Sequence, residues 1–173
     1  AILWRRKAIG RSLRALGGAW SDATRAAPKS AAFSVLILGL ASTGAWLPTL
    51  QYDDLVYHLR LPWQLQLQGQ YLLDPSPQVW ALAPWASDVV HAIAQLIGTA
   101  AARGPVNLLW LALTAGGLWR LGAALHATPQ ARWLMIALFA SLPLTTALLG
   151  GMHTEVATTA MLAWFLALIL ERE

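Results

Sequence analysis

The most restrictive feature of this sequence is a stretch without a charged side chain, running from the residue after Lys29 to the residue before Asp53. About 20 apolar residues are enough for one helical crossing of a bilayer, and residues 31–50 supply them. The whole chain has the same character: 57% of its 173 residues are apolar and 12% are charged, whereas a soluble domain carries about a quarter charged residues. This composition excludes an ordinary soluble globular domain, and the excess of apolar side chains excludes disorder. We therefore expect an integral membrane protein.

The apolar stretches predict an all-α membrane protein with four transmembrane helices. The expected spans cover residues 31–50, 105–125, 133–149 and 152–170. Residues 1–30 form a basic arm ahead of them, and residues 51–104 form a long loop between the first and second spans. The predicted organisation is an N-terminal arm followed by a four-helix transmembrane domain over residues 31–170.

The distribution of Lys and Arg predicts the side of the membrane that each segment occupies. Seven of the twelve basic residues lie in the first thirty positions, whereas the loop over residues 51–104 has two basic residues and four acidic ones. Because basic residues are enriched on the cytoplasmic side, both termini are expected in the cytoplasm and the long loop outside a bacterial inner membrane. Apolar residues at helical spacing over residues 2–20 predict a helix lying in the headgroup region, and a disordered basic tail is the alternative.

The sequence also excludes several classes of chemistry. It has no Cys, which removes disulfides, zinc–thiolate sites, iron–sulfur clusters and Cys nucleophiles. It has no phosphate-cradling Gly loop, no nucleophile elbow and no His-Glu-x-x-His motif. The basic arm lacks the aromatic and motif support of a nucleic-acid-binding surface. The expected partner is therefore the lipid bilayer and not nucleic acid.

The long outer loop is predicted to contain two juxtamembrane amphipathic helices. The acidic pair Asp53-Asp54 precedes apolar residues that recur at every fourth position, which is typical of a short amphipathic helix. A second helix is expected over residues 86–102, capped by Ser87 or Asp88 and too short to span a bilayer. Both helices are expected to rest on the outer leaflet.

Three acids and their neighbours are the candidate functional residues. At a helix N-terminus, Asp53 and Asp54 are held ionised and can accept a proton or hold a cation near a leaving phosphate, although simple helix capping is an equal alternative. Glu155 lies about 6 Å into the fourth span, where an acid is a functional candidate unless it snorkels to the interface. His58 and Arg60 can face an anionic headgroup, or they are solvated loop residues. The other histidines are expected to be interfacial or turn residues: His91, His126 and His153.

The order of these parts resembles the N-terminal module of GT-C glycosyltransferases, integral membrane enzymes that use polyprenyl-phosphate sugars. Protein O-mannosyltransferases and the lipid A aminoarabinose transferase are examples. Their first outer loop begins with an acidic pair followed by an aromatic residue, and the sequence Asp-Asp-Leu-Val-Tyr at residues 53–57 is similar. The stretch over residues 57–62 also looks like uncharacterised bacterial members.

This resemblance implies a reaction and roles for named residues. Asp53 would be the catalytic carboxylate, Asp54 would support it, and Glu155 matches the further acid that members carry in the second outer loop. By the same resemblance, the residues that follow the acidic pair would contact substrate: Tyr57, His58 and Arg60. A polyprenyl-phosphate sugar would be the donor, with no resident cofactor and no predicted metal ligands, although a divalent metal is compatible with the chemistry.

The number of predicted spans keeps another class of function open. GT-C enzymes usually have eight or more spans, so the chain is either the N-terminal fragment of such a glycosyltransferase or a non-catalytic transmembrane subunit of a larger complex that retains the module as a scaffold. A small transporter or channel is a third class, which the sequence disfavours because no expected span carries a row of charges or an evident break.

Overall fold

The structure is a computed structural model that describes residues 17–49, 51–70, 86–99 and 102–171. Every regular element in these ranges is a helix, which confirms the predicted all-α class. After a helix over Gly17–Ala26, the elements are α2 (Pro28–Ser42), the 3₁₀ turn η1 (Thr43–Trp46), the π turn η2 (Asp54–His58), α3 (Arg60–Gln68), α4 (Ala86–Gly98), α5 (Arg103–Ala124), α6 (Pro129–Ser141), α7 (Pro143–Leu149) and α8 (Thr154–Leu170). Most of the helix predicted over residues 2–20 lies outside the described residues.

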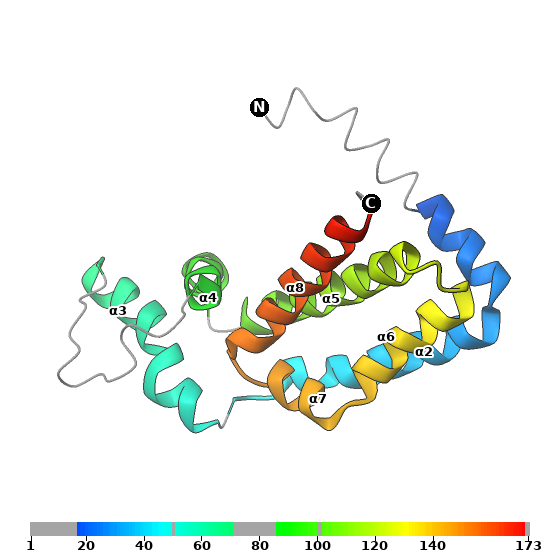
Figure 1. Cartoon of the computed structure of the whole chain (residues 1–173). Coiled ribbons are helices and arrows are strands. Elements are labelled where there is room, and N and C mark those ends of the chain that lie inside the picture. Colours follow the sequence, from blue (N-terminus) through cyan, green and yellow to red (C-terminus); the bar gives the residue numbers. More distant parts are fainter. Residues whose placement is uncertain (1–16, 50, 71–85, 100–101, 172–173) are drawn as a thin grey trace.

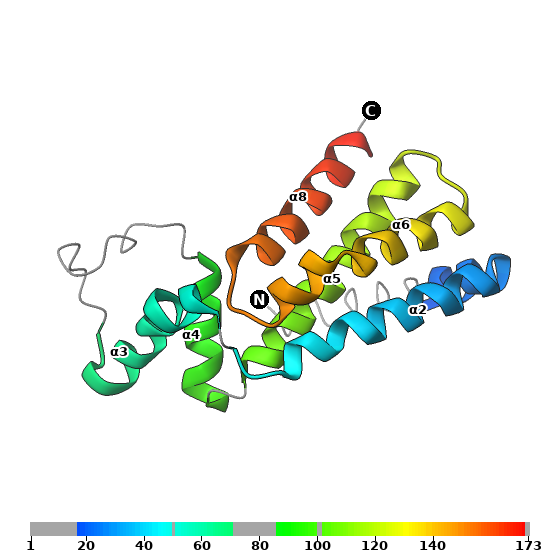
Figure 2. The same cartoon turned by 90° about the horizontal axis from the view of Figure 1, so that it is seen from below.

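The helices form a bundle with a smaller helical pair at one end. The bundle is built from two closely packed pairs, α5 with α8 and α2 with α6, and α5 also contacts α6. The predicted juxtamembrane segments are helical: α3 and α4 pack on each other beside the end of the bundle where α5 and α8 begin (Figure 1). The view from below gives the same arrangement, with α3 and α4 set apart from α6 (Figure 2).

The predicted single helix over residues 133–149 is wrong, because a proline divides it. Leu142 adopts extended dihedral angles (φ −66°, ψ 128°) between Pro129–Ser141 and Pro143–Leu149, and the two helices meet at 66°. Proline disfavours helical geometry at the preceding residue and lacks the N–H that a continuing helix needs. As the first residue of α7, Pro143 instead begins a new helix.

The described helices meet the criteria for membrane spans only in part. No single helix among the described residues combines the length and the apolar composition needed to cross a bilayer. Two bent pairs meet both criteria when their members are taken together: Gly17–Ala26 with Pro28–Trp46, which meet at 115°, and Pro129–Ser141 with Pro143–Leu149. The four-span topology therefore stays a prediction.

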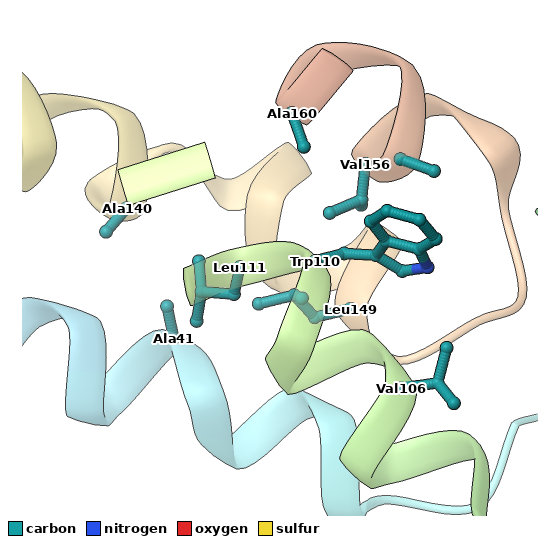
Figure 3. Packing of buried hydrophobic residues seen from close by; sticks show 9 residues of the cluster. Ala41, Val106, Trp110, Leu111, Ala140, Leu149, Val156 and Ala160 are labelled. Atoms are coloured by element: carbon teal, nitrogen blue, oxygen red, sulfur yellow. The ribbon is translucent and has the colours of Figure 1, made fainter. Parts of the chain in front are cut away.

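The main core lies between α5 and α8, with α2, α6 and α7 closing it. Trp110 and Leu111 of α5 are its large central side chains, between Ala41 of α2 and Val156 of α8 (Figure 3). The buried members of this core are Ala41, Val106, Trp110, Leu111, Ala140, Leu149, Val156, Ala157 and Ala160. Four of the nine are alanines, so the helix backbones approach closely.

Glycine at one position of α5 is required by this close approach. A Cβ atom on Gly117 would lie 2.9 Å from the Cβ of Ala163 and 3.2 Å from the backbone nitrogen of Trp164. The Trp164 indole N–H donates to the carbonyl of Leu113 at 2.8 Å and fixes the same contact from the other helix. The α5–α8 interface therefore has no room for a side chain at residue 117.

We predict that Gly117→Ala lowers the free energy of unfolding by about 1–3 kcal/mol, because overpacking forces the two helices apart. Gly39→Ala is the matched control, since Gly39 is also in a helix but a Cβ added there would have no atom within 4 Å. That change should stabilise the protein by up to about 1 kcal/mol through helix propensity. Thermal unfolding of the purified variants, followed by circular dichroism, measures both; equal effects would contradict close packing at Gly117.

Candidate functional site

Buried polar side chains gather where η1, η2 and α7 end and α4, α5 and α8 begin. We name this cluster the polar junction. It consists of Thr49, Gln51, Asp54, His58, Asp88, His91, Arg103, Asn107 and the turn over residues 150–153. Burial of so many polar groups is costly unless they are hydrogen-bonded, so the partners of each define what the junction does.

The carboxylate of Asp54 joins the start of the outer loop to the turn between α7 and α8. Asp54 is fully buried, and both of its oxygens accept the backbone N–H of Met152, at 2.9 and 3.0 Å. The Thr49 hydroxyl donates to Oδ2 as well. A Cβ on Gly151 would lie 3.1 Å from Oδ2 and 2.7 Å from the His153 ring, so glycine at this position lets the carboxylate reach the backbone.

Side chains from the first turns of α5 hold the same turn from the opposite side. The amide of Asn107 donates to the carbonyls of Leu149 and Gly151, at 2.8 and 2.6 Å. The guanidinium of Arg103 donates to the carbonyl of Gly150 at 2.6 Å and to that of Leu47. These bonds satisfy carbonyls that the ends of η1 and α7 leave unpaired. The turn is therefore fixed by hydrogen bonds from two directions.

A buried histidine–aspartate pair links η2 to α4. His58 Nδ1 lies 2.7 Å from Asp88 Oδ1, and both side chains are more than nine-tenths buried. Burial alone would lower the pKa of His58, but the hydrogen bond to Asp88 and the charges of Asp88, Asp54 and Asp53 outweigh it and raise that pKa above 6.5. Burial raises the pKa of Asp88, and the bond to His58 opposes this. The pair thus retains a proton that two exposed side chains would release.

His91 is the opposite case, because burial keeps it neutral. Its side chain is 0% exposed, and the Asn107 amide and the Arg103 guanidinium are close enough to act on its ring. Burial, with the positive charge of Arg103 as a second cause, lowers its pKa to about 4. The junction therefore contains one histidine that favours the charged form and one that resists it.

The structure brings the first acidic pair and the Glu155 turn into the same region. The Gln51 side chain donates to the carbonyl of Ala147 at 2.7 Å, and its oxygen contacts His153 Nε2. Nδ1 of His153 lies 3.8 Å from the carboxylate of Glu155, whose side chain is 60% exposed. The two predicted turns are thus adjacent, but Glu155 lies at the edge of the polar junction and not inside it.

The remaining predicted site residues have different surroundings. Asp53 is half-buried and makes no hydrogen bond or ion pair with any described residue, although its charge acts on His58. Arg60, the first residue of α3, is also half-buried. The side chain of Tyr57 lies outside the described part of the chain. Within that part, Asp53 is the acid of the pair whose carboxylate is not already committed to the fold.

Two cavities border the junction without including its predicted acids. One, of about 380 Å³, lies between α4, α5 and α8, and the other, of about 510 Å³, lies beside η1 and α7. Among the described residues, neither has Asp53, Asp54 or Glu155 in its lining. No group of three or more His, Asp or Glu side chains in the described ranges is arranged to hold a metal ion.

Sequence reasoning did not identify most residues of the junction as functional, including Asp88, His91, Arg103 and Asn107. Asp88 was predicted to be a helix cap and His91 an interfacial residue, whereas both are buried within the cluster. Arg103 was counted only as a basic residue of the long loop, and Asn107 fell within the predicted span over residues 105–125 without being singled out. A signal was available in the last two: an Arg and an Asn within the first five residues of an apolar helix need buried partners.

We predict that Asp54→Ala lowers the free energy of unfolding by about 2–3 kcal/mol, because it leaves the Met152 N–H buried without an acceptor. Asp54→Asn keeps one acceptor oxygen and should lose less. Asp53→Asn is the matched control and should stay within about 0.5 kcal/mol of the wild type, as for a residue outside such a network. Chemical denaturation of the three variants tests this, and an equal loss for both aspartates would contradict the assignment of Asp54 as the structural acid.

The shifted pKa values of His91 and His58 predict how the free energy of unfolding depends on pH. Because folding suppresses protonation of His91, the unfolded chain binds more protons between pH 6.5 and about 4, and the free energy of unfolding falls as pH drops through this range. The loss should reach up to roughly 3 kcal/mol. The loss should be absent in His91→Gln and retained in His126→Asn, which changes an exposed turn residue.

His58 gives the opposite dependence of the free energy of unfolding on pH: its stabilisation is complete below pH 6.5 and is lost as pH rises through its raised pKa. Histidine NMR titration resolves the two.

Comparison with known proteins identifies no relative of this chain. No protein-family model, no curated protein and no solved structure matches it. Its function therefore has to be inferred from its own residues and their geometry.

Proposed function

We propose that this chain is a GT-C-like membrane module that transfers a sugar from a polyprenyl-phosphate donor to an acceptor on the outer face of the membrane. Two features support the proposal: the way apolar side chains are distributed over α2 and α8, and the carboxylate of Asp53 beside the polar junction, which makes no hydrogen bond or ion pair with a described residue. The Asp53 carboxylate supports the proposed chemistry, and the distribution of apolar side chains supports the proposed location in a membrane.

On α2 and α8 the buried residues are mostly small, and large apolar residues lie on the exposed faces. On α8 the buried residues are Val156 and four alanines, whereas Met161, Leu162 and Phe165 are 57%, 52% and 60% exposed. On α2 the buried residues are Ala31, Ser34 and Ala41, and the exposed ones include Phe33, Val35, Leu36 and Leu40. A water-soluble bundle has the reverse order, with its large apolar side chains in the core. Small residues at the contact and large ones at the periphery are typical of helices packed in lipid.

The helix lengths are compatible with an integral membrane protein. At 1.5 Å per residue, α5 is about 33 Å long, close to the ~30 Å of a bilayer hydrocarbon core. Its polar residues Arg103, Asn107 and Arg120 lie toward its two ends, where they can reach the polar junction or the opposite interface. We propose that the four predicted spans, which the structure builds from α2 with η1, from α5, from the bent pair α6–α7 and from α8, form the four crossings. Both termini are then cytoplasmic, and α3 and α4 lie on the outer leaflet of an inner membrane.

The two aspartates of the acidic pair divide their roles. Asp54 holds the turn between α7 and α8 through the Met152 N–H, so it fixes the backbone from which its neighbour projects. Asp53 is half-buried, close enough to His58 to raise that histidine's pKa, and without a partner among the described residues. A carboxylate in these surroundings is available as a general base.

The proposed reaction uses Asp53 as the proton acceptor. Asp53 removes the proton from an acceptor hydroxyl, whose oxygen forms the new bond to the anomeric carbon of the donor sugar. The bond from that carbon to the phosphate oxygen breaks, and polyprenyl phosphate leaves with the electron pair. In this proposal Arg60, which is half-buried in the same segment, stabilises the departing phosphate directly, and His58 acts on it through its charge from the buried pair with Asp88.

The alternative is a non-catalytic subunit that retains the module as a scaffold. It is favoured by the extent to which Asp54, Arg103 and Asn107 are engaged in fixing one turn, since such bonds serve stability without chemistry. Under this alternative the apolar periphery of the bundle contacts other subunits. It predicts stoichiometric copurification of a larger complex from native membranes.

We predict that Asp53→Asn in the native full-length protein reduces sugar transfer by at least about 100-fold, because a general base contributes on the order of 10²–10⁴ in rate. Asp22→Asn is the control: Asp22 is an exposed acid paired with Arg25 at 3.7 Å, in the helix before α2. Transfer of a labelled sugar from a polyprenyl-phosphate donor in membranes is the measurement. Transfer at the wild-type rate by the Asp53 variant would rule out the proposed role and leave the scaffold alternative.

A further inference from the structure

The cavity between α4, α5 and α8 has the shape and chemistry of a lipid site. It has a volume of about 380 Å³ and is lined by three residues of α4, Trp110 of α5 and four residues of α8. None of these eight residues is charged. The rim is apolar and exposed, because Val90 is 38% and Met161 57% accessible, and Met161 belongs to the peripheral face of α8 described above. The cavity therefore opens toward the side of the bundle that we propose to be lipid.

Two polar atoms of the lining residues are enclosed and unsatisfied. The hydroxyl of Ser87 and the indole N–H of Trp110 are buried and have no hydrogen-bond partner among the described residues. The two residues are 6% and 8% exposed, and both line this cavity. In Figure 3 the indole nitrogen of Trp110 lies on the far side of the ring from Leu111. A buried donor without an acceptor is destabilising, so the wall lacks a group that a ligand could supply.

We propose that this cavity binds one acyl chain of a diacyl glycerophospholipid, and that the Ser87 and Trp110 side chains, whose polar atoms are enclosed in this structure, turn toward the cavity so that the lipid's ester carbonyl accepts the Trp110 N–H and the Ser87 hydroxyl. Both donors are neutral, and the described lining contains no Lys, Arg or His. That chemistry matches an uncharged carbonyl oxygen and not a phosphate, which is recognised by cations or by clustered backbone N–H groups. The inference rests on the membrane location in the proposed function and is independent of the sugar-transfer chemistry.

The position of the donors fits the depth of an ester group in a bilayer. Ser87 is in the first turn of α4, and Thr154, also in the lining, is the first residue of α8. Both lie next to the polar junction, at the end of the bundle that we assign to the outer leaflet. Ester carbonyls lie between headgroups and hydrocarbon, where Trp is enriched because one part of its ring is apolar and its N–H needs a partner.

A matched pair of threonines on α8 tests whether the cavity is the site. Thr158 and Thr159 both donate to the carbonyl four residues earlier, at 2.9 and 2.7 Å, but only Thr158 lines the cavity. Native mass spectrometry of the purified full-length protein, titrated with dioleoyl phosphatidylglycerol, measures the bound lipid. Thr158→Phe, which fills the cavity, should weaken the first lipid by at least about 10-fold, whereas Thr159→Phe should leave it within about 2-fold. Equal weakening by the two changes, or none, would overturn the site.

The donors are tested by removing the acceptor from the ligand. The diether analogue of the same lipid keeps the chains and headgroup but has no carbonyl, so it should bind the wild type about 3- to 10-fold more weakly, as for one or two lost hydrogen bonds. Trp110→Phe keeps a ring in the core without the N–H, and Ser87→Ala is a second variant that leaves the core ring intact. Each should reduce the preference for the diacyl lipid.

The remaining outcomes separate this site from the proposed function. An undiminished diacyl preference in both donor variants, or competition by polyprenyl phosphate with no binding of diacyl lipid, would overturn the assignment. Release of the protein from membranes by alkaline extraction would instead contradict the membrane location itself. Loss of sugar transfer in Asp53→Asn, with lipid binding unchanged, leaves the lipid site supported on its own evidence.

Discussion

The arrangement of the bundle depends on one carboxylate accepting one backbone N–H. Asp54 binds the Met152 N–H across a sequence separation of 98 residues and closes the start of the outer loop onto the turn between α7 and α8. Gly151 makes the approach possible, and Asn107 and Arg103 hold the carbonyls of the same turn from α5. Buried bonds of this kind have no water to replace them, so the turn has one conformation and the residues around it have fixed positions.

The parts of the fold that local sequence determines were predicted well. The apolar stretches and the spacing of apolar residues in the outer loop located α2, α3, α4, α5 and α8, because helix periodicity is a property of neighbours in sequence. The break at Leu142 was missed although Pro143 is visible in the sequence. An apolar run around a proline gives no information on whether one helix or two supply the apolar residues.

The partners within the polar junction could not be predicted, because they come from distant segments. Asp88 has the spacing of a helix cap, and only the packing of α4 against η2 places it 2.7 Å from His58. His91 has no local signal that distinguishes an interfacial histidine from one that is 0% exposed. The acidic pair was found, but sequence spacing gave no means of separating the roles of Asp53 and Asp54, since the distinction depends on which carboxylate reaches Met152.

The distinction between the two aspartates also explains why a membrane module would keep both. A general base has to be oriented but not neutralised, and an acid that is locked by hydrogen bonds cannot accept a proton readily. Asp54 provides the rigid backbone, and Asp53, one residue earlier, projects from it with no described partner. The small-in, large-out packing of α2 and α8 gives the same rigidity at the scale of the bundle, because close backbone contacts fix the helices while the periphery remains apolar. In the function that we propose, this arrangement holds the Asp53 carboxylate at the edge of the bilayer.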